Sequence, residues 1–362
     1  MEAKQYLGYI GRGLRTSGPP IHLTLFVTGR CNLRCRHCFH WEDVAAGTDG
    51  PSLAEVRMLA DSSARMGPLL WVALAGGEPF LRDDLPELAG AFGRHGVRHL
   101  SIPTNGLVGE RQHEAVERML TLCPDTHVNV AVSIDGPPEV HDEIRQVEGG
   151  YARALAAVRR FREQAERHER LGAGLIVTVT RENQDVLGPH LEELVREVRP
   201  DHLTINLART DALDRTLLEV DPDRYREVVA EKRRLQEAGL LGRYSHPFAR
   251  VAEARDRLTY QRVEQVSRGE GGPHLSCTAG SLSAVVFEDG TVRACEVLDD
   301  DLGNLHEVDW DLERLWGSER AEALRRKVRE TRCECTWECA QADNVLFRPE
   351  SWPQLAREVL RI

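Results

Sequence analysis

The stretch HLTLFVTGRCNLRCRHCFH, residues 22–40, decides the fold, because it joins a β-rich apolar run to a loop with three cysteines. Cys31, Cys35 and Cys38 follow the run with C-x3-C-x2-C spacing, which lets one loop surround a compact metal centre with three sulfurs. Thiolates are the usual ligands of iron–sulfur clusters, which normally take four of them. Three ligands leave one iron open, and an open position distinguishes a reactive metal centre from a closed structural one.

The cysteine usage of the whole chain supports metal binding. The chain has nine cysteines and no signal for export, so we expect a cytoplasmic protein in which thiols stay reduced and no disulfide framework forms. Five further cysteines lie near the end of the chain and Cys123 stands alone, which predicts two metal sites. On the first loop alone, zinc is an alternative to iron, with His37 or His40 as the fourth ligand.

The composition is typical of a globular protein with about two domains. The chain has 362 residues, 41% of them hydrophobic and 29% charged, and a domain commonly takes about 150 residues. No apolar run approaches the roughly 20 residues that span a bilayer, so no integral membrane segment is expected. Lys and Arg total 47 against 58 Asp and Glu, and the net charge of −11 disfavours nucleic acid as a partner.

Short apolar runs alternate with longer helical patterns between residues 21 and 240, which predicts an α/β fold of repeated βα units. Strands are predicted at residues 22–28, 69–75, 97–103, 127–133, 175–180 and 202–208. Helices are predicted from residue 52 onward and at residues 84–95, 110–122, 151–170, 186–198 and 222–238. Six units predict a partial (β/α)6 TIM-like barrel that stays open on one side, with its chemistry in the loops after the strands.

Four parts are predicted along the chain. They are an N-terminal extension (1–20), the partial barrel (21–240), a linker (241–276) and a small C-terminal cysteine-rich domain (277–362). In the last part, Asp289 and Gly290 between two β-rich runs predict a hairpin, and a helix is predicted at residues 311–329. The N-terminal extension has apolar residues at helical spacing, which favours a helix packed on the barrel over one on a membrane surface.

Three short motifs follow the second, third and fourth predicted strands, and all would meet at one rim of the barrel. They are GGEP at residues 76–79, TNG at 104–106 and SIDG at 133–136, and HDEIR follows at 141–145. Together with the cysteine loop, this order of motifs resembles the radical S-adenosylmethionine (SAM) superfamily. The resemblance implies that the three-cysteine loop binds a 4Fe-4S cluster whose open iron takes the methionine part of SAM.

The resemblance also implies which residues contact SAM. The GGEP segment would meet the amino group, the serine and aspartate of SIDG the ribose, the arginine of HDEIR the carboxylate, and the aromatic residue after the third cysteine the adenine. The residues assigned in this way are Phe39, Gly76, Gly77, Glu78, Pro79, Thr104, Asn105, Ser133, Asp135 and Arg145. A one-electron reductant such as flavodoxin or ferredoxin would start the cleavage of SAM, and the resulting 5′-deoxyadenosyl radical would remove hydrogen from a substrate.

The second cysteine group resembles the SPASM/Twitch region, which binds auxiliary clusters in this superfamily. Cys277 is followed by twelve residues, then Gly290, four residues and Cys295, as at the start of that region. The resemblance implies an auxiliary 4Fe-4S cluster, and five cysteines, against seven in the full SPASM pattern, favour one such cluster over two. The firmest ligand candidates are Cys277, Cys295 and Cys339, while Cys333 and Cys335 compete for the fourth place. A zinc ribbon-like structural site is the alternative on spacing alone.

Arg209, after the sixth predicted strand, is the leading candidate for a substrate clamp, because arginine can hold a carboxylate or phosphate with two hydrogen bonds. The alternative is that it pairs with Asp211. The leading function is oxidation of a small metabolite, with the auxiliary cluster as electron acceptor. The runner-up is a maturase of a ribosomally made peptide, and a third reading from another class is a zinc-binding interaction protein without catalysis.

Overall fold

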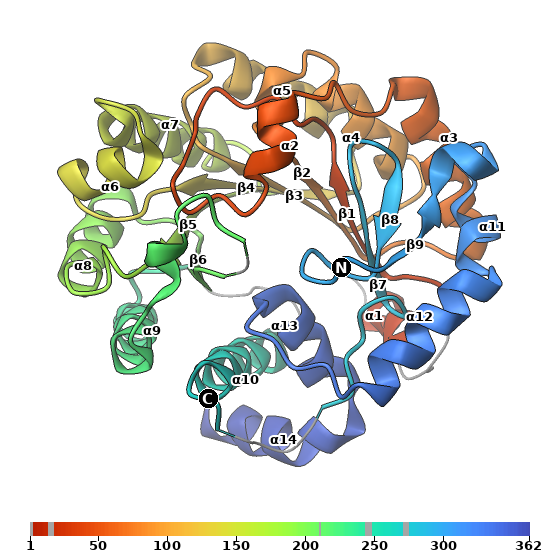
Figure 1. The fold of residues 1–362 in the computed structure, drawn as a ribbon. Helices are drawn as coiled ribbons and strands as arrows, with labels where there is room; N and C mark the ends of the chain where they lie inside the picture. Colours follow the sequence, from red (N-terminus) through yellow and green to blue (C-terminus); the bar gives the residue numbers. More distant parts are fainter. Residues whose placement is uncertain (1–2, 14–17, 210, 243–247, 271–274) are drawn as a thin grey trace.

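The structure is a computed structural model that describes residues 3–13, 18–209, 211–242, 248–270 and 275–362, with side chains from Gly8 onward in the first range. At its centre lies one sheet of nine strands in the order β6-β5-β4-β3-β2-β1-β7-β8-β9. Figure 1 shows this sheet curving like part of a barrel wall, with α4, α5, α7 and α8 on its outside.

The first six strands pair in parallel, and each is followed by at least one helix. The strands are β1 His22–Phe26, β2 Trp71–Ala75, β3 His99–Thr104, β4 His127–Ser133, β5 Leu171–Val179 and β6 His202–Leu207. The main helices between and after them are α3 Leu53–Met66, α4 Leu85–Gly93, α5 Glu110–Leu122, α7 Gly150–Ala165, α8 Leu187–Val198 and α9 Pro222–Glu237. Shorter elements are α2 Trp41–Ala46, α6 Pro138–Arg145, η1 Pro79–Leu81 and η2 Arg215–Leu218. The predicted α/β fold with a partial parallel barrel is confirmed.

The core lies between the sheet and these helices. Successive strand side chains point to opposite faces, and in β1 the side chains of Leu23 and Leu25 are fully buried on the helix side. His22 and Thr24 alternate with them on the inner face of the barrel. Helix α3 begins at a capping box, in which the Ser52 hydroxyl accepts from the Glu55 N–H and the Glu55 carboxylate accepts from the Ser52 N–H.

Strand β5 begins four residues earlier than the sequence predicts, at Leu171. The added residues include Gly172 and Gly174, and glycine is unfavourable in the interior of a strand. The structure explains them: a Cβ atom on Gly174 would collide with the imidazole ring of His202 on the neighbouring strand. Gly174 makes room for His202, and Gly172 makes room in the same way for Asn129 on the other neighbouring strand, so a local pattern could not reveal them as part of a strand.

The C-terminal part continues the sheet of the barrel. β7 (Ser283–Val286) pairs in parallel with β1, and β8 (Thr291–Arg293) and β9 (Asp301–Asn304) follow in antiparallel fashion. The hairpin predicted at Asp289 and Gly290 is the turn between β7 and β8. The helix predicted at 311–329 is divided into α11 (Leu312–Trp316) and α12 (Glu319–Glu330), because Ser318 caps a new helix by accepting from the Ala321 N–H. The turn η3 (Leu305–Val308) precedes them.

The predicted linker contains a long helix. α10 (Ala249–Ser267) packs against α13 (Glu338–Phe347) and α14 (Trp352–Arg361), with η4 (Pro349–Ser351) between the last two. These helices share a small apolar core formed by Ala254, Leu258, Leu275, Val345 and Leu355. Residues 243–247 and 271–274 of the same segment lie outside the described residues. The segment therefore includes a packed helix, which the weak periodicity of its sequence does not reveal.

The same helices cover the open edge of the barrel at β6. The Tyr260 hydroxyl accepts from the Ile205 N–H at 3.2 Å, and the Glu338 carboxylate accepts from the Leu207 N–H at 2.7 Å. An edge strand has N–H groups without a neighbouring strand, and pairing them keeps the edge from joining another sheet. Figure 1 shows α10 and α13 opposite β1 to β4, on the side where the barrel is open.

Helix α1 (Ala3–Gly13) packs on the barrel. The side chain of Tyr9 is buried and its hydroxyl lies 3.3 Å from the carbonyl oxygen of Leu69, while Arg12 donates to the carbonyl of Pro68 at 2.6 Å. This arrangement agrees with the predicted packed helix. Among the helices of the described residues, none has both the length and the apolar character needed to cross a membrane.

Candidate functional site

Cys31, Cys35 and Cys38 lie together in the loop after β1, and all three have free thiols. Burial raises the pKa of Cys31 to about 11 and that of Cys38 to about 12, and the charge of Cys35 raises both further. The backbone N–H of Leu33 donates to the sulfur of Cys31 at 3.4 Å. Three desolvated thiols that converge from one loop fit a metal centre, whose binding releases their protons.

The spacing of these sulfurs agrees with a cluster. A tetrahedral zinc with bonds of about 2.3 Å brings its sulfur ligands to within about 4 Å of one another. Among the described residues, the one group of three metal-ligand side chains with ligand atoms within 4.8 Å of each other is His40, Asp43 and Glu288. At least one pair of sulfurs in the first loop is therefore more than 4.8 Å apart, as the larger iron–sulfur cluster allows.

The GGEP segment after β2 pairs with the start of the cysteine loop. The N–H of Gly77 donates to the carbonyl of Thr28 at 2.7 Å, and the N–H of Glu78 donates to the carbonyl of Arg30 at 2.8 Å. Gly76 has a φ of +143°, and a Cβ on either glycine would collide with these carbonyl groups. The two glycines are needed because only a backbone without side chains can approach the loop this closely.

The buried carboxylate of Glu78 connects the GGEP segment with the TNG segment, and Asn105 connects both with the cysteine loop. Its carboxylate accepts from the Phe80 N–H at 3.1 Å, from the Thr104 hydroxyl at 2.9 Å and from the Asn105 N–H at 2.8 Å. Burial raises the pKa of Glu78 to about 7, although these hydrogen bonds lower it in part. Asn105 in turn donates to the side chain of Asn32 at 2.8 Å, within the cysteine loop.

Asp135 and Arg145 form a buried ion pair beside the cysteine loop. Arg145 Nε lies 2.7 Å from Asp135 Oδ2, and Arg145 Nη1 lies 4.0 Å from the sulfur of Cys35. Burial alone would raise the pKa of Asp135, but the charge of Arg145 outweighs it and lowers the value to about 2. The second oxygen of Asp135 accepts from the Thr178 N–H at 2.9 Å. Each oxygen contacts a protein group, and Asp135 positions Arg145. A contact of Asp135 with the ribose of SAM stays a prediction.

The remaining two SAM-contact predictions concern Phe39 and Ser133. Phe39 is partly buried and makes an edge-on contact with Phe26, with ring centroids 6.4 Å apart. Ser133 is the last residue of β4 and shares its face of the strand with Asn129 and Ala131. Pro79 starts the turn η1 next to Glu78. The structure thus brings the cysteine loop and the four motifs to one rim, and their contacts with SAM stay predictions.

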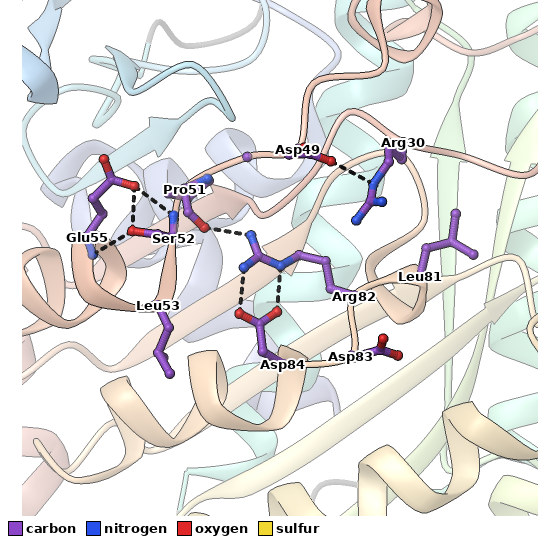
Figure 2. A pocket seen from close by; sticks show the side chains of 11 residues that line it. Arg30, Asp49, Pro51, Ser52, Leu53, Glu55, Leu81, Arg82, Asp83 and Asp84 are labelled. Atoms are coloured by element: carbon purple, nitrogen blue, oxygen red, sulfur yellow. Dashed lines mark hydrogen bonds and ion pairs between the residues drawn. The ribbon is translucent and has the colours of Figure 1, made fainter.

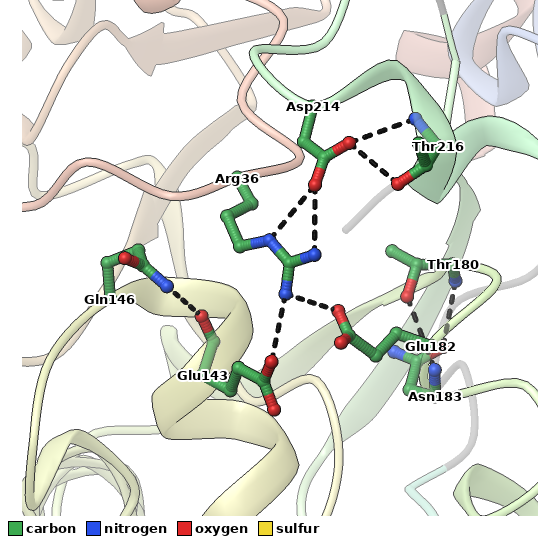
Figure 3. A network of polar contacts seen from close by, with 8 residues as sticks. All are labelled: Arg36, Glu143, Gln146, Thr180, Glu182, Asn183, Asp214 and Thr216. Carbon is green, nitrogen blue, oxygen red and sulfur yellow. Dashed lines mark hydrogen bonds and ion pairs between the residues drawn. The ribbon is translucent and has the colours of Figure 1, made fainter.

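Arg36, between the second and third cysteines, fastens the loop to the other side of the rim (Figure 3). Its guanidinium lies 2.9 Å from Asp214, 2.7 Å from Glu182 and 3.2 Å from Glu143. Two backbone hydrogen bonds join the same segments. The Asp214 N–H donates to the Arg36 carbonyl at 2.8 Å, and the Leu213 N–H donates to the Cys38 carbonyl at 3.2 Å. Sequence reasoning missed Arg36, because its three carboxylate partners lie more than 100 positions away.

His40, two residues after the third cysteine, connects the loop to the C-terminal hairpin. Its imidazole lies 3.0 Å from both Asp43 and Glu288, and Glu288 belongs to the turn after β7. Burial would lower the pKa of His40, but the two carboxylates raise it to about 9. The rings of Phe26 and Phe287 pack against it with centroids 4.5 and 5.9 Å away. From the sequence, His40 is a candidate fourth ligand of zinc, and no local pattern marks Glu288 as its partner.

The five C-terminal cysteines all have free thiols but differ in exposure. Cys277 and Cys295 are buried, Cys333 and Cys335 are half-buried, and Cys339 is exposed. The pKa of the Cys277 thiol is raised and that of Cys333 is lowered, chiefly because the two thiols interact with each other. Cys277 precedes β7, Cys295 follows β8, and Cys333 and Cys335 precede α13, so the group is assembled from distant segments.

Arg209 does not have the open guanidinium expected of a substrate clamp. It pairs with Glu338, the first residue of α13, and lies 3.8 Å from Glu296. All three side chains are largely buried, and Asp211, the pairing partner considered from the sequence, contacts Arg215 instead. The two carboxylates balance the charge of Arg209, so the structure replaces the clamp with a link between β6 and the C-terminal cysteine region.

A cavity of about 590 Å³ lies on the outer side of the GGEP loop, near the starts of α3 and α4. Figure 2 shows that its charged side chains pair among themselves: Arg30 with Asp49 at 3.2 Å, and Arg82 with Asp84 at 2.7 Å. Arg82 also donates to the Pro51 carbonyl at 2.6 Å. These groups hold together the loops around the cavity, which borders the start of the cysteine loop at Arg30.

Partial parallel barrels with a three-cysteine loop at the carboxyl rim define a class of iron–sulfur enzymes that use SAM. Residues 25–194 match the radical SAM superfamily, and residues 277–340 match SPASM, an iron-sulfur cluster-binding domain. Residues 25–194 therefore form a radical SAM domain, and residues 277–340 form a SPASM domain. These domains imply a 4Fe-4S cluster that binds SAM and an auxiliary iron–sulfur cluster. They speak against the third alternative, a zinc-binding protein without catalysis.

Similar proteins include enzymes of haem synthesis. The chain is 36% identical over 174 residues to a pre-heme d1 synthase of Dinoroseobacter shibae, a match that covers 46% of this chain and 38% of that protein. It is 25% identical over 316 residues to an AdoMet-dependent heme synthase of Oleidesulfovibrio alaskensis, covering 82% and 75% respectively. The chain thus spans less than half the length of the first of these relatives.

Solved structures support the fold. The crystal structure of Streptococcus suis SuiB bound to S-adenosylmethionine superimposes with a TM-score of 0.61 at 16% identity, over 89% of this chain and 71% of that one. At this identity the likeness extends to the fold alone. It agrees with a partial barrel followed by a SPASM region.

Proposed function

We propose that the chain is an oxidoreductase that removes a hydrogen atom from a small organic substrate and passes one electron to its auxiliary cluster. The observation that carries this proposal is the pairing of β7 with β1, which fixes both cysteine groups to one continuous sheet. The first loop follows the carboxyl end of β1, whereas Cys277 precedes β7 and Cys295 follows the antiparallel β8. The two groups are therefore offset along the strands, by roughly 20 Å for a strand of about six residues.

A substrate held between the two groups would meet SAM at one end and the auxiliary cluster at the other. When bound, SAM and its cluster supply a 5′-deoxyadenosyl radical that takes the hydrogen atom, and the auxiliary cluster takes one electron, so that loss of a proton completes a two-electron oxidation. The part of the protein is to orient the reacting groups and to exclude water. A one-electron reductant such as flavodoxin or ferredoxin, in the cytoplasm, would supply the starting electron.

The residues of the rim have separate tasks in this proposal. Cys31, Cys35 and Cys38 hold the first cluster, and the GGEP backbone is fixed against their loop through the buried carboxylate of Glu78. Arg145, held by Asp135, presents its guanidinium next to the cluster loop, where it would attract the carboxylate of SAM.

We also propose a revised role for the four predicted segments. The barrel (21–240) holds the SAM site and the C-terminal segment (277–362) holds the auxiliary site. The segment 241–276 acts as part of the barrel wall, because α10 covers the edge of β6 together with α13. The extension (1–20) supports the barrel through Tyr9.

The similar proteins include both kinds of enzyme. The AdoMet-dependent heme synthase, named for a small-molecule product, matches 82% of this chain, whereas a PqqA peptide cyclase of Xanthomonas oryzae matches 41% of it. The longer match favours a small substrate. A peptide maturase is the alternative, and size fractionation of the substrate separates the two. Anaerobic protein with dithionite and SAM should form more 5′-deoxyadenosine when the dialysable fraction of a cell extract is added.

Two results would contradict the proposal. Stimulation by the retained, peptide-containing fraction alone would favour a maturase. Stoichiometric zinc in place of about eight irons per chain, with no 5′-deoxyadenosine from SAM alone, would exclude radical chemistry altogether. The control is Cys35→Ala, which lacks one ligand of the first cluster and should form no 5′-deoxyadenosine under any condition.

A further inference from the structure

We propose that His40, Asp43 and Glu288 bind a divalent transition-metal cation at a site separate from both cysteine groups, and that this cation holds the β7–β8 turn against the first cysteine loop. The proposal adds one ion to the two iron–sulfur clusters and does not depend on the proposed oxidation. Two carboxylates and one imidazole are a donor set for ions such as Mn²⁺, Fe²⁺ and Zn²⁺.

The ligand atoms of these three residues converge from two distant parts of the chain. His40 directly precedes α2 and Asp43 lies in the first turn of this helix, whereas Glu288 lies in the turn between β7 and β8. One ligand atom of each residue lies within 4.8 Å of the other two. Metal–ligand bonds of about 2.0–2.2 Å place neighbouring ligand atoms roughly 3–3.5 Å apart, so small side-chain rotations bring the three atoms to bonding distance.

The imidazole of His40 bridges the two carboxylates in this structure. Its Nδ1 lies 3.0 Å from Asp43 and its Nε2 lies 3.0 Å from Glu288. A cation would take the lone pair of one ring nitrogen together with one oxygen of each carboxylate, and that nitrogen would then no longer donate a hydrogen bond. The bridging imidazole and the bound cation are therefore alternative ways of joining the same two segments.

The buried carboxylate of Glu288 provides an independent sign of a ligand, because one of its oxygens lacks a partner. Oε1 faces His40, but Oε2 is buried and has no hydrogen-bond donor among the described residues. The side chain is only 3% exposed, so bulk solvent does not reach it. A buried carboxylate oxygen without a partner is costly, and a cation would supply the missing contact.

Gly29, at the start of the first loop, allows two oxygens to approach each other. A Cβ atom on Gly29 would lie 2.9 Å from Glu288 Oε1 and 2.9 Å from the backbone carbonyl oxygen of Asp43. Gly29 does not have a positive φ, so the close approach, and not its backbone conformation, requires glycine here. The carbonyl oxygen is a further ligand atom of a kind that Mn²⁺ accepts.

The surroundings of the site favour a bound ion and leave it a way in. The rings of Phe26 and Phe287 stack with centroids 5.0 Å apart, and both pack against His40. An apolar shell of this kind excludes water and strengthens the attraction between a cation and its ligands. Asp43 is about half exposed, so an ion can enter from its side.

Manganese binding tests the site, because Mn²⁺ prefers oxygen and nitrogen ligands over thiolates. The probe is Mn²⁺ added to the anaerobic protein with both clusters assembled, and electron paramagnetic resonance measures the Mn²⁺ that stays free. We expect one bound ion per chain, and at least tenfold weaker binding in Asp43→Asn and in Glu288→Gln. Iron should stay at about eight per chain in both variants, because the cysteines are unchanged.

The matched control is Asp61→Asn, which removes a carboxylate that also pairs with a histidine, His95, but at an exposed position beside Arg94. This variant should bind Mn²⁺ as the wild type does. Asp43→Asn changes a half-exposed side chain and keeps the test valid even where the buried change Glu288→Gln disturbs folding. Absence of binding to the wild type at millimolar Mn²⁺, or equal binding by the wild type and Asp43→Asn, would overturn the proposal.

Hydrogen exchange tests whether the ion holds the turn against the loop. The amide of Gly290 donates to the Phe287 carbonyl at 3.0 Å within the β7–β8 turn. Its exchange in the wild type should be at least tenfold slower with saturating Mn²⁺ than without it, because the ion ties the turn to α2. In Asp43→Asn the same amount of Mn²⁺ should leave the exchange unchanged. Equal exchange with and without bound Mn²⁺ in the wild type would contradict the linking role.

Discussion

The two cysteine groups differ in how the chain assembles them. The first group lies within eight residues of one loop, from Cys31 to Cys38, so its spacing along the sequence almost fixes its spacing in space. The second group draws on residues 277–339, with a three-stranded region and two helices between its members. There the folding of the segments between the cysteines decides which sulfurs meet. Spacing along the chain is therefore a stronger guide to ligands within one loop than across a folded domain.

The structure also joins the two groups through a few buried polar contacts. His40 connects the first loop to Glu288 in the β7–β8 turn, and Arg209 connects β6 to Glu338 beside the second group. Each contact places charge in a largely buried position, where the loss of one partner costs more than the pair contributes. The substitutions below act on one group at a time or on the contacts between them.

The largest effect is expected from Cys35→Ala, which breaks the first group and leaves the second intact. Loss of a residue that only hydrogen-bonds to a metal ligand typically lowers activity roughly 10–100-fold. Because Cys35 is itself a ligand, formation of 5′-deoxyadenosine from SAM should fall by far more. Iron per chain should fall by about half, because the auxiliary cysteines are untouched. Liquid chromatography of the nucleoside and an iron assay measure both. Cys123→Ala serves as the control and should change neither quantity, whereas loss of all iron in Cys35→Ala would show that the groups do not assemble independently.

Arg145→Met is expected to have the next largest effect, this time on stability. It removes the guanidinium from the fully buried Asp135, and an uncompensated buried carboxylate costs about 3–5 kcal/mol. Urea unfolding of the anaerobic protein, compared with wild type, measures this loss. Arg153→Met, at an exposed position of α7, is the matched control. A change below about 1 kcal/mol, within the range of exposed ion pairs, would show that Asp135 finds another partner.

The contact between the two groups should make stability depend on pH through His40. Its pKa is about 9 in the folded chain against an ordinary value of 6.5, so the protonated imidazole stabilises the fold fully below pH 6.5. This contribution is lost as the pH rises from 6.5 to 9, by up to about 3 kcal/mol. His40→Gln should remove that part of the decline in unfolding free energy. His95→Gln, at an exposed pair with Asp61, controls for loss of any histidine.

Equal slopes for wild type and His40→Gln between pH 6.5 and 9 would contradict the ion pairs assigned to His40. The measurement therefore also tests whether the turn at Glu288 is held against the first loop. If the turn at Glu288 is held against the first loop by His40, the two cysteine groups are connected in the folded protein, although the chain assembles them in different ways.

Much of the fold follows from local sequence. Strand β4 and helix α5 occupy the predicted residues 127–133 and 110–122, because their apolar periodicity is regular and no neighbour alters it. Helix α10 was predicted only as a linker with some helix, since its packing partners α13 and α14 follow about 80 residues later. The local pattern of apolar residues predicts an element well when its apolar face packs against neighbouring elements of the barrel. The pattern is not sufficient when a segment far along the sequence covers that face.

The same distinction applies to the site. The order of the rim motifs places Glu78 and Asn105 beside the cysteine loop, because the carboxyl ends of parallel strands share one edge. The partners of Arg209 and Arg36 could not be predicted, because the acids that bind them come from the C-terminal domain and from three separate loops. Ion pairs between distant segments leave no spacing in the sequence.

The smallest effect is expected from Arg36→Met, which sharpens how far the first group depends on its own loop. The guanidinium is about a quarter exposed and binds three carboxylates, so its loss should cost about 1 kcal/mol in unfolding free energy. Iron content should stay at about eight per chain, since the cysteines are unchanged. The specific consequence is local: the amides of Leu213 and Asp214, which donate to the loop, should exchange hydrogen faster. Arg215→Met, which removes a fully surface-exposed pair, should leave their exchange unaltered. If the exchange of these two amides is unchanged in Arg36→Met, the backbone hydrogen bonds are sufficient to hold the cysteine loop, and the first cysteine group does not depend on the ion pairs of Arg36.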